Sequence, residues 1–213
     1  LVTASQFIHS GAHQRVMVIG ADKMSSILDM TDRNTCVLFG DGAGGVILDR
    51  CENSSLGLVD FLHRADGRDK SSLNVLGGGS LNPASHESVD QGLHFVRQDG
   101  RSVFKFAVSK MAEVSVELLD RNGLTGRDLK LFIPHQANLR IIDAAAERMK
   151  LPQEKVLVNI DRFANTTAAT IPIALSQAFD EKRFQNEDLL LMTGVGAGLT
   201  WGSALFRWGE NCG

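Results

Sequence analysis

The chain has few cysteines, and none of them has the spacing of a metal site. Cys36, Cys51 and Cys212 are the only three among 213 residues, and they are too scattered to form a zinc motif. Unpatterned cysteines of this kind are typical of proteins from reducing compartments. We therefore expect a cytoplasmic protein without a structural metal ion or a disulfide framework.

Long apolar runs and a strong charge of one sign are also absent. No apolar stretch approaches the roughly 18 residues that a membrane-spanning helix needs, so we expect no membrane segment. With 22 basic and 25 acidic residues the net charge is −3, which gives no reason to expect nucleic-acid binding. Hydrophobic residues make up 43% of the chain, which excludes a disordered protein, and the length allows one domain or two.

Apolar runs and segments of helical periodicity mark the expected elements. The run at residues 16–19 is typical of a strand covered on both faces. Residues 64–92 are rich in Gly, Ser, Asp and Asn, as lids and binding loops often are. We expect strands at 16–19, 36–39, 45–48, 57–61, 131–133, 156–158, 189–192 and 203–206, and helices at 1–10, 101–122, 126–129, 139–149 and 168–179.

Two glycine-rich segments, 40–44 and 194–198, each lie between apolar strands. This similarity favours two alike halves of one α/β architecture. Gly40, Gly42 and Gly45 also match the dinucleotide-binding fingerprint, but that motif requires a helix directly after the glycines. Residues 46–48 look like a strand instead, so we interpret these glycines as a tight turn at a crowded site.

His135 and Asn165 are the strongest candidates for catalytic residues. Each lies just past the end of an expected element, where two neutral donors can be aimed at one point. Such a pair suits a reaction in which a carbonyl oxygen gains negative charge. The alternative for either residue alone is a structural role, which is the more frequent role of a single loop histidine.

Longer motifs around these residues resemble those of the 3-oxoacyl-[acyl-carrier-protein] synthase III family. The segments are 134–140 (PHQANLR), 164–167 (ANTT), 194–203 (GVGAGLTWGS), 31–35 (TDRNT) and 39–44 (FGDGAG). They are long and occur in the family's order, and the resemblance runs from Leu1 to about Trp208.

This resemblance implies an α/β, thiolase-like fold of five alternating layers, αβαβα, with two pseudo-symmetric halves. The chain would then hold the end of the first half (1–62), an irregular connecting and binding segment (63–92) and the whole second half (93–213). It also implies the reaction that initiates type II fatty acid synthesis, a decarboxylative Claisen condensation of an acyl-CoA primer with malonyl-carrier protein. The product is 3-oxoacyl-carrier protein.

The resemblance further implies a Cys-His-Asn catalytic set, of which the nucleophilic cysteine is missing here. In the family that cysteine precedes the region matching Leu1. Cys36 lies in a strand-like run where a small buried thiol is expected, Cys51 follows a strand end, and Cys212 lies in a polar tail. We therefore expect this chain to be the C-terminal two-thirds of an enzyme, with the missing N-terminal part as its partner.

The remaining site residues are also implied by the resemblance. The backbone N–H near Ala197 would complete an oxyanion hole, and Arg33 would lie against the adenine of coenzyme A. Coenzyme A thioester and carrier-bound phosphopantetheine are substrates, no resident cofactor is implied, and the enzyme is expected to be a homodimer. The expected pantetheine contacts are Gly100, Phe104 and Asn138, and the expected carrier-protein contacts are Lys105, Gln136, Ala137, Asn138, Leu139 and Arg140.

Two alternatives remain open at this point. The chain could be a non-catalytic piece that supplies packing and a dimer surface. It could also belong to another Cys-His-Asn condensing enzyme of the polyketide or chalcone-synthase kind, although the context of His135 fits the initiation enzyme better. Asn165 argues against the elongating synthases, which use two histidines.

Overall fold

The centre of the molecule is a four-stranded mixed sheet with the order β3-β8-β7-β6. The computed structural model describes residues 1–210, so Cys212 lies outside the described residues. β6 runs parallel to β7, whereas β8 is antiparallel to both β7 and β3. The strands span Gly57–Ala65 (β3), Leu131–Pro134 (β6), Leu189–Gly196 (β7) and Thr200–Arg207 (β8).

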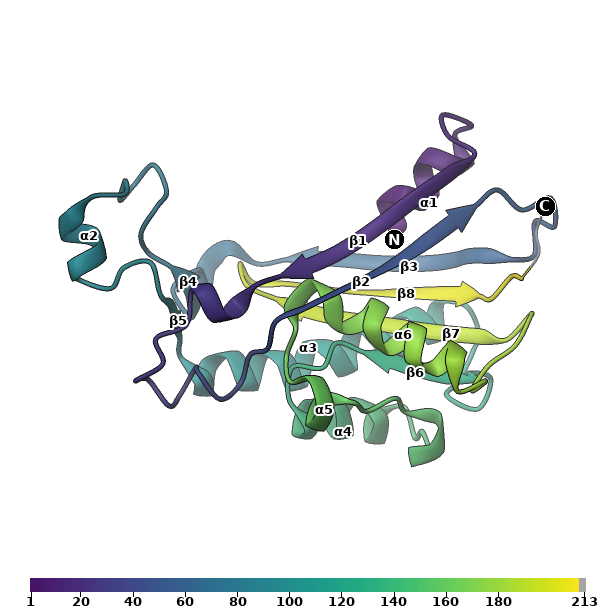
Figure 1. Cartoon of the computed structure of the whole chain (residues 1–213). Coiled ribbons are helices and arrows are strands. Elements are labelled where there is room, and N and C mark those ends of the chain that lie inside the picture. Colours follow the sequence, from purple (N-terminus) through teal and green to yellow (C-terminus); the bar gives the residue numbers. More distant parts are fainter. Residues whose placement is uncertain (211–213) are drawn as a thin grey trace.

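Helices cover both faces of this sheet (Figure 1). On one face lie α3 (Gly100–Arg121) and α4 (Leu139–Arg148), and on the other lies α6 (Thr170–Asp180). Phe132 of β6 packs toward α3 and α4, while its neighbours Leu131 and Ile133 pack toward α6. Alternate strand residues thus enter two separate cores, which is why β6 is apolar throughout.

A second, two-stranded sheet lies on the far side of α6. It pairs β1 (Arg15–Asp22) antiparallel with β2 (Gly42–Asp49). The approach is close, because a Cβ on Gly20 would lie only 2.3 Å from the Ala168 carbonyl oxygen. α1 (Val2–His9) packs against the same two strands, so the described residues form layers in the order α, β, α, β.

The outward face of this small sheet is exposed. Met17, Ile19 and Ile47 are each more than 60% exposed, whereas the alternate residues of both strands are half-buried. Within residues 1–210 the expectation that 16–19 is covered on both faces is therefore wrong, because the outward side chains of Met17 and Ile19 are exposed.

The irregular stretch after β3 carries small elements. β4 (Leu73–Val75) pairs with β5 (Val96–Gln98), and between them α2 (His86–Asp90) projects from the body, at the left of Figure 1. The other described elements are short helices of about one turn. They are η1 (Met24–Ser26), η2 (Gly67–Asp69), η3 (Gln153–Lys155), α5 (Ile160–Phe163) and η4 (Thr167–Ala169).

The main helices and strands confirm their sequence predictions. α3 begins at the Asp99 cap, whose carboxylate accepts from the N–H groups of Arg101 and Ser102, and Gly123 follows its end with φ +66°. β2 begins at Gly42 itself, which confirms that no dinucleotide-type helix follows the glycines. The proposed boundary at residue 62 falls inside β3, which pairs with β8 in the larger sheet.

Two predicted elements are wrong. Residues 36–38 form a turn rather than a strand, and Phe39 makes a one-residue bridge to Asn165. The turn forms because the carbonyl oxygen of Asp32 accepts from the Cys36 N–H (3.0 Å) and its carboxylate accepts from Thr35 Oγ1 (3.0 Å). Residues 126–129 form a turn rather than a helix, because the Asp128 carboxylate accepts from both the N–H and the hydroxyl of Thr125 (2.8 Å each).

The predicted strand at 156–158 is reduced to one bridge. Val156 pairs with Phe132, and Leu157 N–H donates to the Phe132 carbonyl at 2.9 Å. The chain then turns away, because the Asn159 N–H donates to Gln136 Oε1 (3.0 Å) instead. This deviation places Asn159 beside the loop that follows β6.

Candidate active site

His135 is the first residue after the buried strand β6. Its backbone N–H donates to the Thr193 carbonyl of β7 (2.8 Å), which continues the pairing of the two strands by one residue. Its ring Nδ1 lies 2.6 Å from the hydroxyl oxygen of Thr170, the first residue of α6. Burial lowers the pKa of the imidazole to about 4, so the ring is neutral at pH 7.

Gln136, the residue after His135, stabilises this loop through the hydrogen bonds of its buried side chain. Gln136 is 1% exposed; its Nε2 donates to the carbonyls of Pro134 (2.9 Å) and Leu157 (3.1 Å), and its Oε1 accepts from the Asn159 N–H (3.0 Å). Both ends of the amide are used within the chain. The expectation that Gln136 contacts a carrier protein is therefore wrong, because the side chain does not reach the surface.

Asn165 lies in the turn between α5 and α6. Its backbone N–H donates to the Leu38 carbonyl and its own carbonyl accepts from the Gly40 N–H, both at 3.0 Å, so a single-residue bridge to Phe39 fixes its place. Its side-chain Oδ1 accepts from the Thr167 N–H (3.0 Å). This bond sets the amide orientation and leaves the Nδ2 group to donate.

The Asp22 carboxylate, at the end of β1, holds the turn after Asn165. Asp22 Oδ2 accepts from the Ala168 N–H (3.0 Å) and from the Thr167 hydroxyl. Thr167 has φ +50°, a backbone conformation that a β-branched residue adopts only when its surroundings hold it there. Sequence reasoning missed Asp22 and Thr170, because contacts between residues 145 (Asp22 and Thr167) and 35 (His135 and Thr170) positions apart leave no local pattern.

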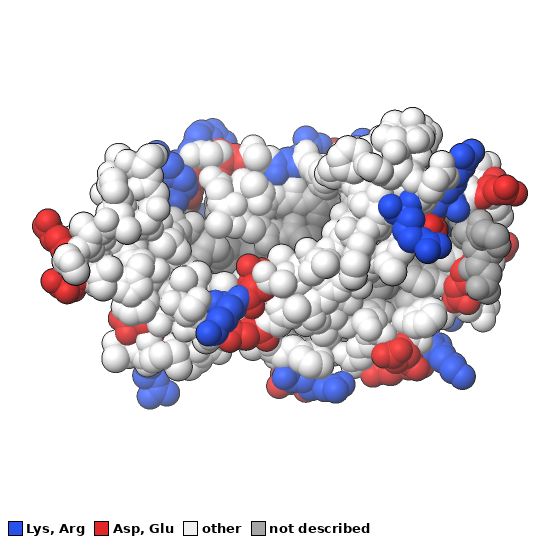
Figure 2. All heavy atoms as spheres, turned by 45° about the horizontal axis from the view of Figure 1, so that its top comes forward, with Lys and Arg blue, Asp and Glu red and all other residues white. Residues whose placement is uncertain are grey.

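Two cavities share the residues around His135 and Asn165. The larger has a volume of about 910 Å³ and the smaller about 510 Å³. The larger extends to Leu1, Val2 and Thr3 at the start of α1. Six residues line both cavities: Phe39, Leu73, His135, Asn165, Val195 and Gly196. The face drawn in Figure 2 is hollowed, and the floor of that hollow is made of uncharged side chains.

The structure brings most of the predicted substrate residues to these cavities. Ala197, at the turn between β7 and β8, lines the larger one. Gly100, Phe104, Ala137 and Asn138 all line the smaller one, which they share with His135 and Asn165. Residues from α3, from the loop after β6 and from the turn before α6 therefore meet at one place.

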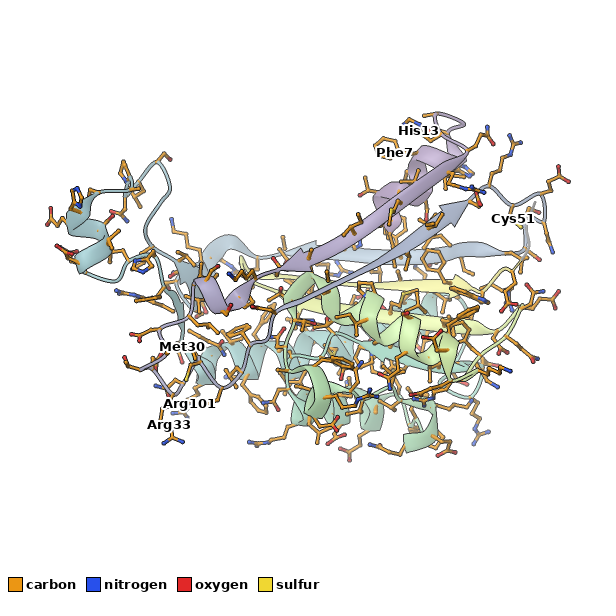
Figure 3. All side chains as sticks on the ribbon, viewed as in Figure 1. Phe7, His13, Met30, Arg33, Cys51 and Arg101 are labelled. Atoms are coloured by element: carbon orange, nitrogen blue, oxygen red, sulfur yellow. The ribbon has the colours of Figure 1, made fainter. Side chains whose placement is uncertain are left out.

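The predicted surface residues lie outside the cavity walls. Arg140 is exposed, and its guanidinium carbon lies 4.8 Å from the centre of the Phe104 ring. Lys105 and Leu139 are exposed as well. Arg33 is exposed beside Asn34, which lines the smaller cavity, and its side chain points away from the body in Figure 3. Asn138 also caps α4, since its Oδ1 accepts from the Arg140 N–H (2.9 Å).

Neither described cysteine belongs to this site. Cys36 and Cys51 are free and partly buried, and neither lines either cavity. Within residues 1–210 no three His, Cys, Asp or Glu side chains are grouped as a metal site would require. In the same range, no helix combines the length and apolar character needed to cross a membrane.

Comparison with known families matches both ends of the chain to one family. The description "3-Oxoacyl-[acyl-carrier-protein (ACP)] synthase III" fits residues 1–67, and the C-terminal model of the same family fits residues 119–208. The first match contains the β1–β2 sheet, and the second contains His135, Asn165 and Ala197. Residues of both matched segments therefore line the larger cavity.

Individual relatives agree with this assignment. Beta-ketoacyl-[acyl-carrier-protein] synthase III of Chlorobium luteolum is 53% identical over 98% of this chain, and that of Koribacter versatilis is 51% identical over 98%. The crystal structure of 3-oxoacyl-[acyl-carrier-protein] synthase III from Aquifex aeolicus is 43% identical over 97% of the chain, with a TM-score of 0.85. The chain spans about 62–64% of the length of these proteins. With both family matches and this shared architecture, the chain belongs to the 3-oxoacyl-[acyl-carrier-protein] synthase III family and has its thiolase-like fold.

Proposed function

We propose that the protein containing this chain initiates fatty acid synthesis. It transfers an acyl group from acyl-CoA to a cysteine, condenses it with malonyl-carrier protein and releases 3-oxoacyl-carrier protein. The observation that carries this proposal is the placement of His135 and Asn165 on the wall that both cavities share. Two residues with a purely structural role would not need to line a cavity, whereas two donors to a reacting oxygen must be accessible to the substrate.

The reaction needs stabilisation of an enolate. The malonyl thioester loses carbon dioxide, and the electron pair of the broken C–C bond moves into the thioester as an enolate. Neutral donors from His135 and Asn165 would stabilise its oxygen, each by roughly 3 kcal/mol. The enolate carbon then attacks the acyl–cysteine carbonyl, the C–S bond breaks, and the thiolate leaves.

The nucleophilic thiol is assigned to the sequence before Leu1. Leu1, Val2 and Thr3 of α1 line the larger cavity together with His135, so the residues that lead into α1 would approach the catalytic pair. A helix N-terminus also favours a thiolate. The Ala197 backbone, which lines the same cavity, would bind the oxygen of the acyl-enzyme as it becomes an oxyanion.

The smaller cavity is proposed as the route of the pantetheine arm. Gly100 has no atom within 4 Å of the position of a Cβ, which leaves room for a chain, and Phe104 and Asn138 line the same passage. Arg33 would meet the adenine of coenzyme A. The exposed residues Lys105, Leu139 and Arg140 would face the acidic carrier protein, with the partly buried Ala137 behind them.

Three further features belong to the same proposal. We assign 1–62, 63–92 and 93–213 to the end of the first half, a connecting segment and the second half, with the boundary inside β3. A homodimer is supported by the exposed apolar face that carries Met17 and Ile19. A cytoplasmic location without resident cofactor is supported by the free Cys36 and Cys51 of the described residues and by the reaction, which requires only its two thioester substrates.

A product assay with the full-length protein tests this function. Labelled acyl-CoA and malonyl-carrier protein are mixed, and label on the carrier protein is followed together with release of carbon dioxide. We expect labelled 3-oxoacyl-carrier protein and carbon dioxide in equal amounts. Absence of both, in protein shown to be folded, would favour the non-catalytic role.

A further inference from the structure

His135 and Thr170 share one short contact whose proton can belong to either residue. Nδ1 of His135 lies 2.6 Å from Oγ1 of Thr170. If the ring donates, Nε2 carries a lone pair; if the hydroxyl donates, the proton of the neutral ring is on Nε2. Only the second arrangement leaves a ring donor for another partner, so the direction of this bond determines what His135 can do.

The proposed function sets the direction of this bond. A neutral ring can donate to an enolate from Nε2 only if its single proton is on that nitrogen. Nδ1 must then accept a hydrogen bond, and the Thr170 hydroxyl, 2.6 Å away, is a donor within reach.

The other acceptor within reach of the Thr170 hydroxyl, the Thr167 carbonyl, already accepts a backbone hydrogen bond. The Thr170 hydroxyl can also donate to the Thr167 carbonyl at 3.1 Å, but that carbonyl accepts from the backbone N–H of Thr170 as well. Losing the hydroxyl proton would not leave that carbonyl without a partner. The proton is therefore available to His135.

The hydroxyl is also held in place. Thr170 is 2% exposed at the start of α6, where a β-branched side chain has few rotamers. The turn before it is fixed by the bond from Ala168 N–H to Asp22 (3.0 Å). A fixed hydroxyl can select one tautomer of the ring, which a mobile one could not.

We propose that Thr170 is a positioning residue that donates its hydroxyl proton to Nδ1 of His135 and thereby keeps the ring proton on Nε2. The contact between the two residues is given by the geometry, and the direction of the bond rests on the proposed function, in which His135 donates to an enolate. Thr170 acts through His135 and does not itself contact the substrate.

Nitrogen NMR of the full-length protein tests the tautomer directly. All histidines of the protein, including the six of this chain, are labelled with ¹⁵N, and the His135 signals are assigned by their loss in His135→Gln. We expect Nε2 to carry the proton at pH 7 in the wild type and in Thr170→Ser. Thr170→Val, which keeps the shape and removes the hydroxyl, should shift the ring toward the Nδ1-protonated form. A wild-type ring protonated on Nδ1 would overturn the proposal, whether or not the valine variant folds.

Kinetics test the consequence separately. Thr170→Val should lower kcat for decarboxylation of malonyl-carrier protein by at least about tenfold with little change in KM, because the wrong tautomer removes a donor, and Thr170→Ser should restore it. Full activity in a valine variant whose tautomer has changed would refute the functional step. Wild-type protein with the expected tautomer but no decarboxylation would leave the tautomer standing and refute the proposed function instead.

Discussion

Asp22 of the β1–β2 sheet holds Ala168 in the turn before α6, at the active site. The Asp22 carboxylate, at the end of β1, accepts from the Ala168 N–H at 3.0 Å, in the turn that carries Asn165 on one side and Thr170 on the other. The position of the proposed donors thus depends on a strand of the smaller sheet as well as on the larger one.

Asp22→Ala should therefore both destabilise the protein and impair catalysis. Loss of the carboxylate leaves the Ala168 N–H without this acceptor, and we expect the free energy of unfolding to fall by about 1–3 kcal/mol. The rate of condensation should fall as well. Asp49→Ala is the matched control, because Asp49 is also in the small sheet but its carboxylate forms an exposed ion pair with Arg15, whose loss should change stability little.

Urea unfolding of both variants, with condensation rates, decides this prediction. A loss of stability at Asp22 no larger than at Asp49 would show that the turn does not depend on the carboxylate.

Asn165→Asp should be more harmful than its small change in size suggests. One carboxylate oxygen can still accept the hydrogen bond from the Thr167 N–H, but the other oxygen replaces the Nδ2 donor and repels an enolate. We expect a loss of at least about 100-fold in condensation at pH 7. Asn165→Ala, which removes the donor without adding charge, is the comparison; near-normal condensation by the aspartate variant would remove Asn165 from the mechanism.

The pH dependence follows from the lowered pKa of His135. Burial lowers it from 6.5 to about 4, so the folded protein keeps the ring neutral where the unfolded chain already takes up a proton. The contribution of this residue to stability is therefore complete above about pH 6.5 and is lost as the pH falls toward 4.

We accordingly expect the decarboxylation rate to be flat between about pH 6 and 8. Rates measured across pH 5–8, together with unfolding curves for wild type and His135→Gln, test this. A rate that declines with an apparent pKa near 6.5 would mean that the ring is solvated rather than buried.

Arg140→Glu should weaken the use of malonyl-carrier protein. Arg140 is exposed above Phe104 at the start of α4, where the helix dipole does not favour a cation, so recognition of an acidic partner is a reason for its presence. KM for the carrier-protein substrate should rise, and more so at low salt. Arg148→Glu, at the other end of α4, is the matched control. Equal losses for acyl-CoA and carrier protein, independent of salt, would indicate a structural role.

Sequence patterns correctly predicted the helices and strands that depend mainly on residues close together in the chain. The helical spacing before Gly123, and the apolar runs of β6 and β7, carry their own structure, and the placement of His135 after β6 follows from them. The turn at 36–38 was missed because hydrogen bonds to Asp32 outweigh the strand-like composition of those residues.

The surroundings of the catalytic pair could not be predicted in this way. Gln136 looks like a polar loop residue, yet it is buried because three backbone groups from Pro134, Leu157 and Asn159 converge on its amide. Asp22 and Thr170 reach the site only through tertiary packing. His135 and Asn165 were singled out by their positions next to regular elements and by the resemblance of their motifs.

The most direct test of the account is to measure the two half-reactions of His135→Ala separately in the full-length protein. We expect decarboxylation of malonyl-carrier protein to fall by at least about 100-fold, while self-acylation by acyl-CoA stays near the wild-type rate. His86→Ala, in the exposed helix α2, serves as the control and should change neither. Loss of acylation with decarboxylation preserved would contradict the role of His135 as an enolate donor.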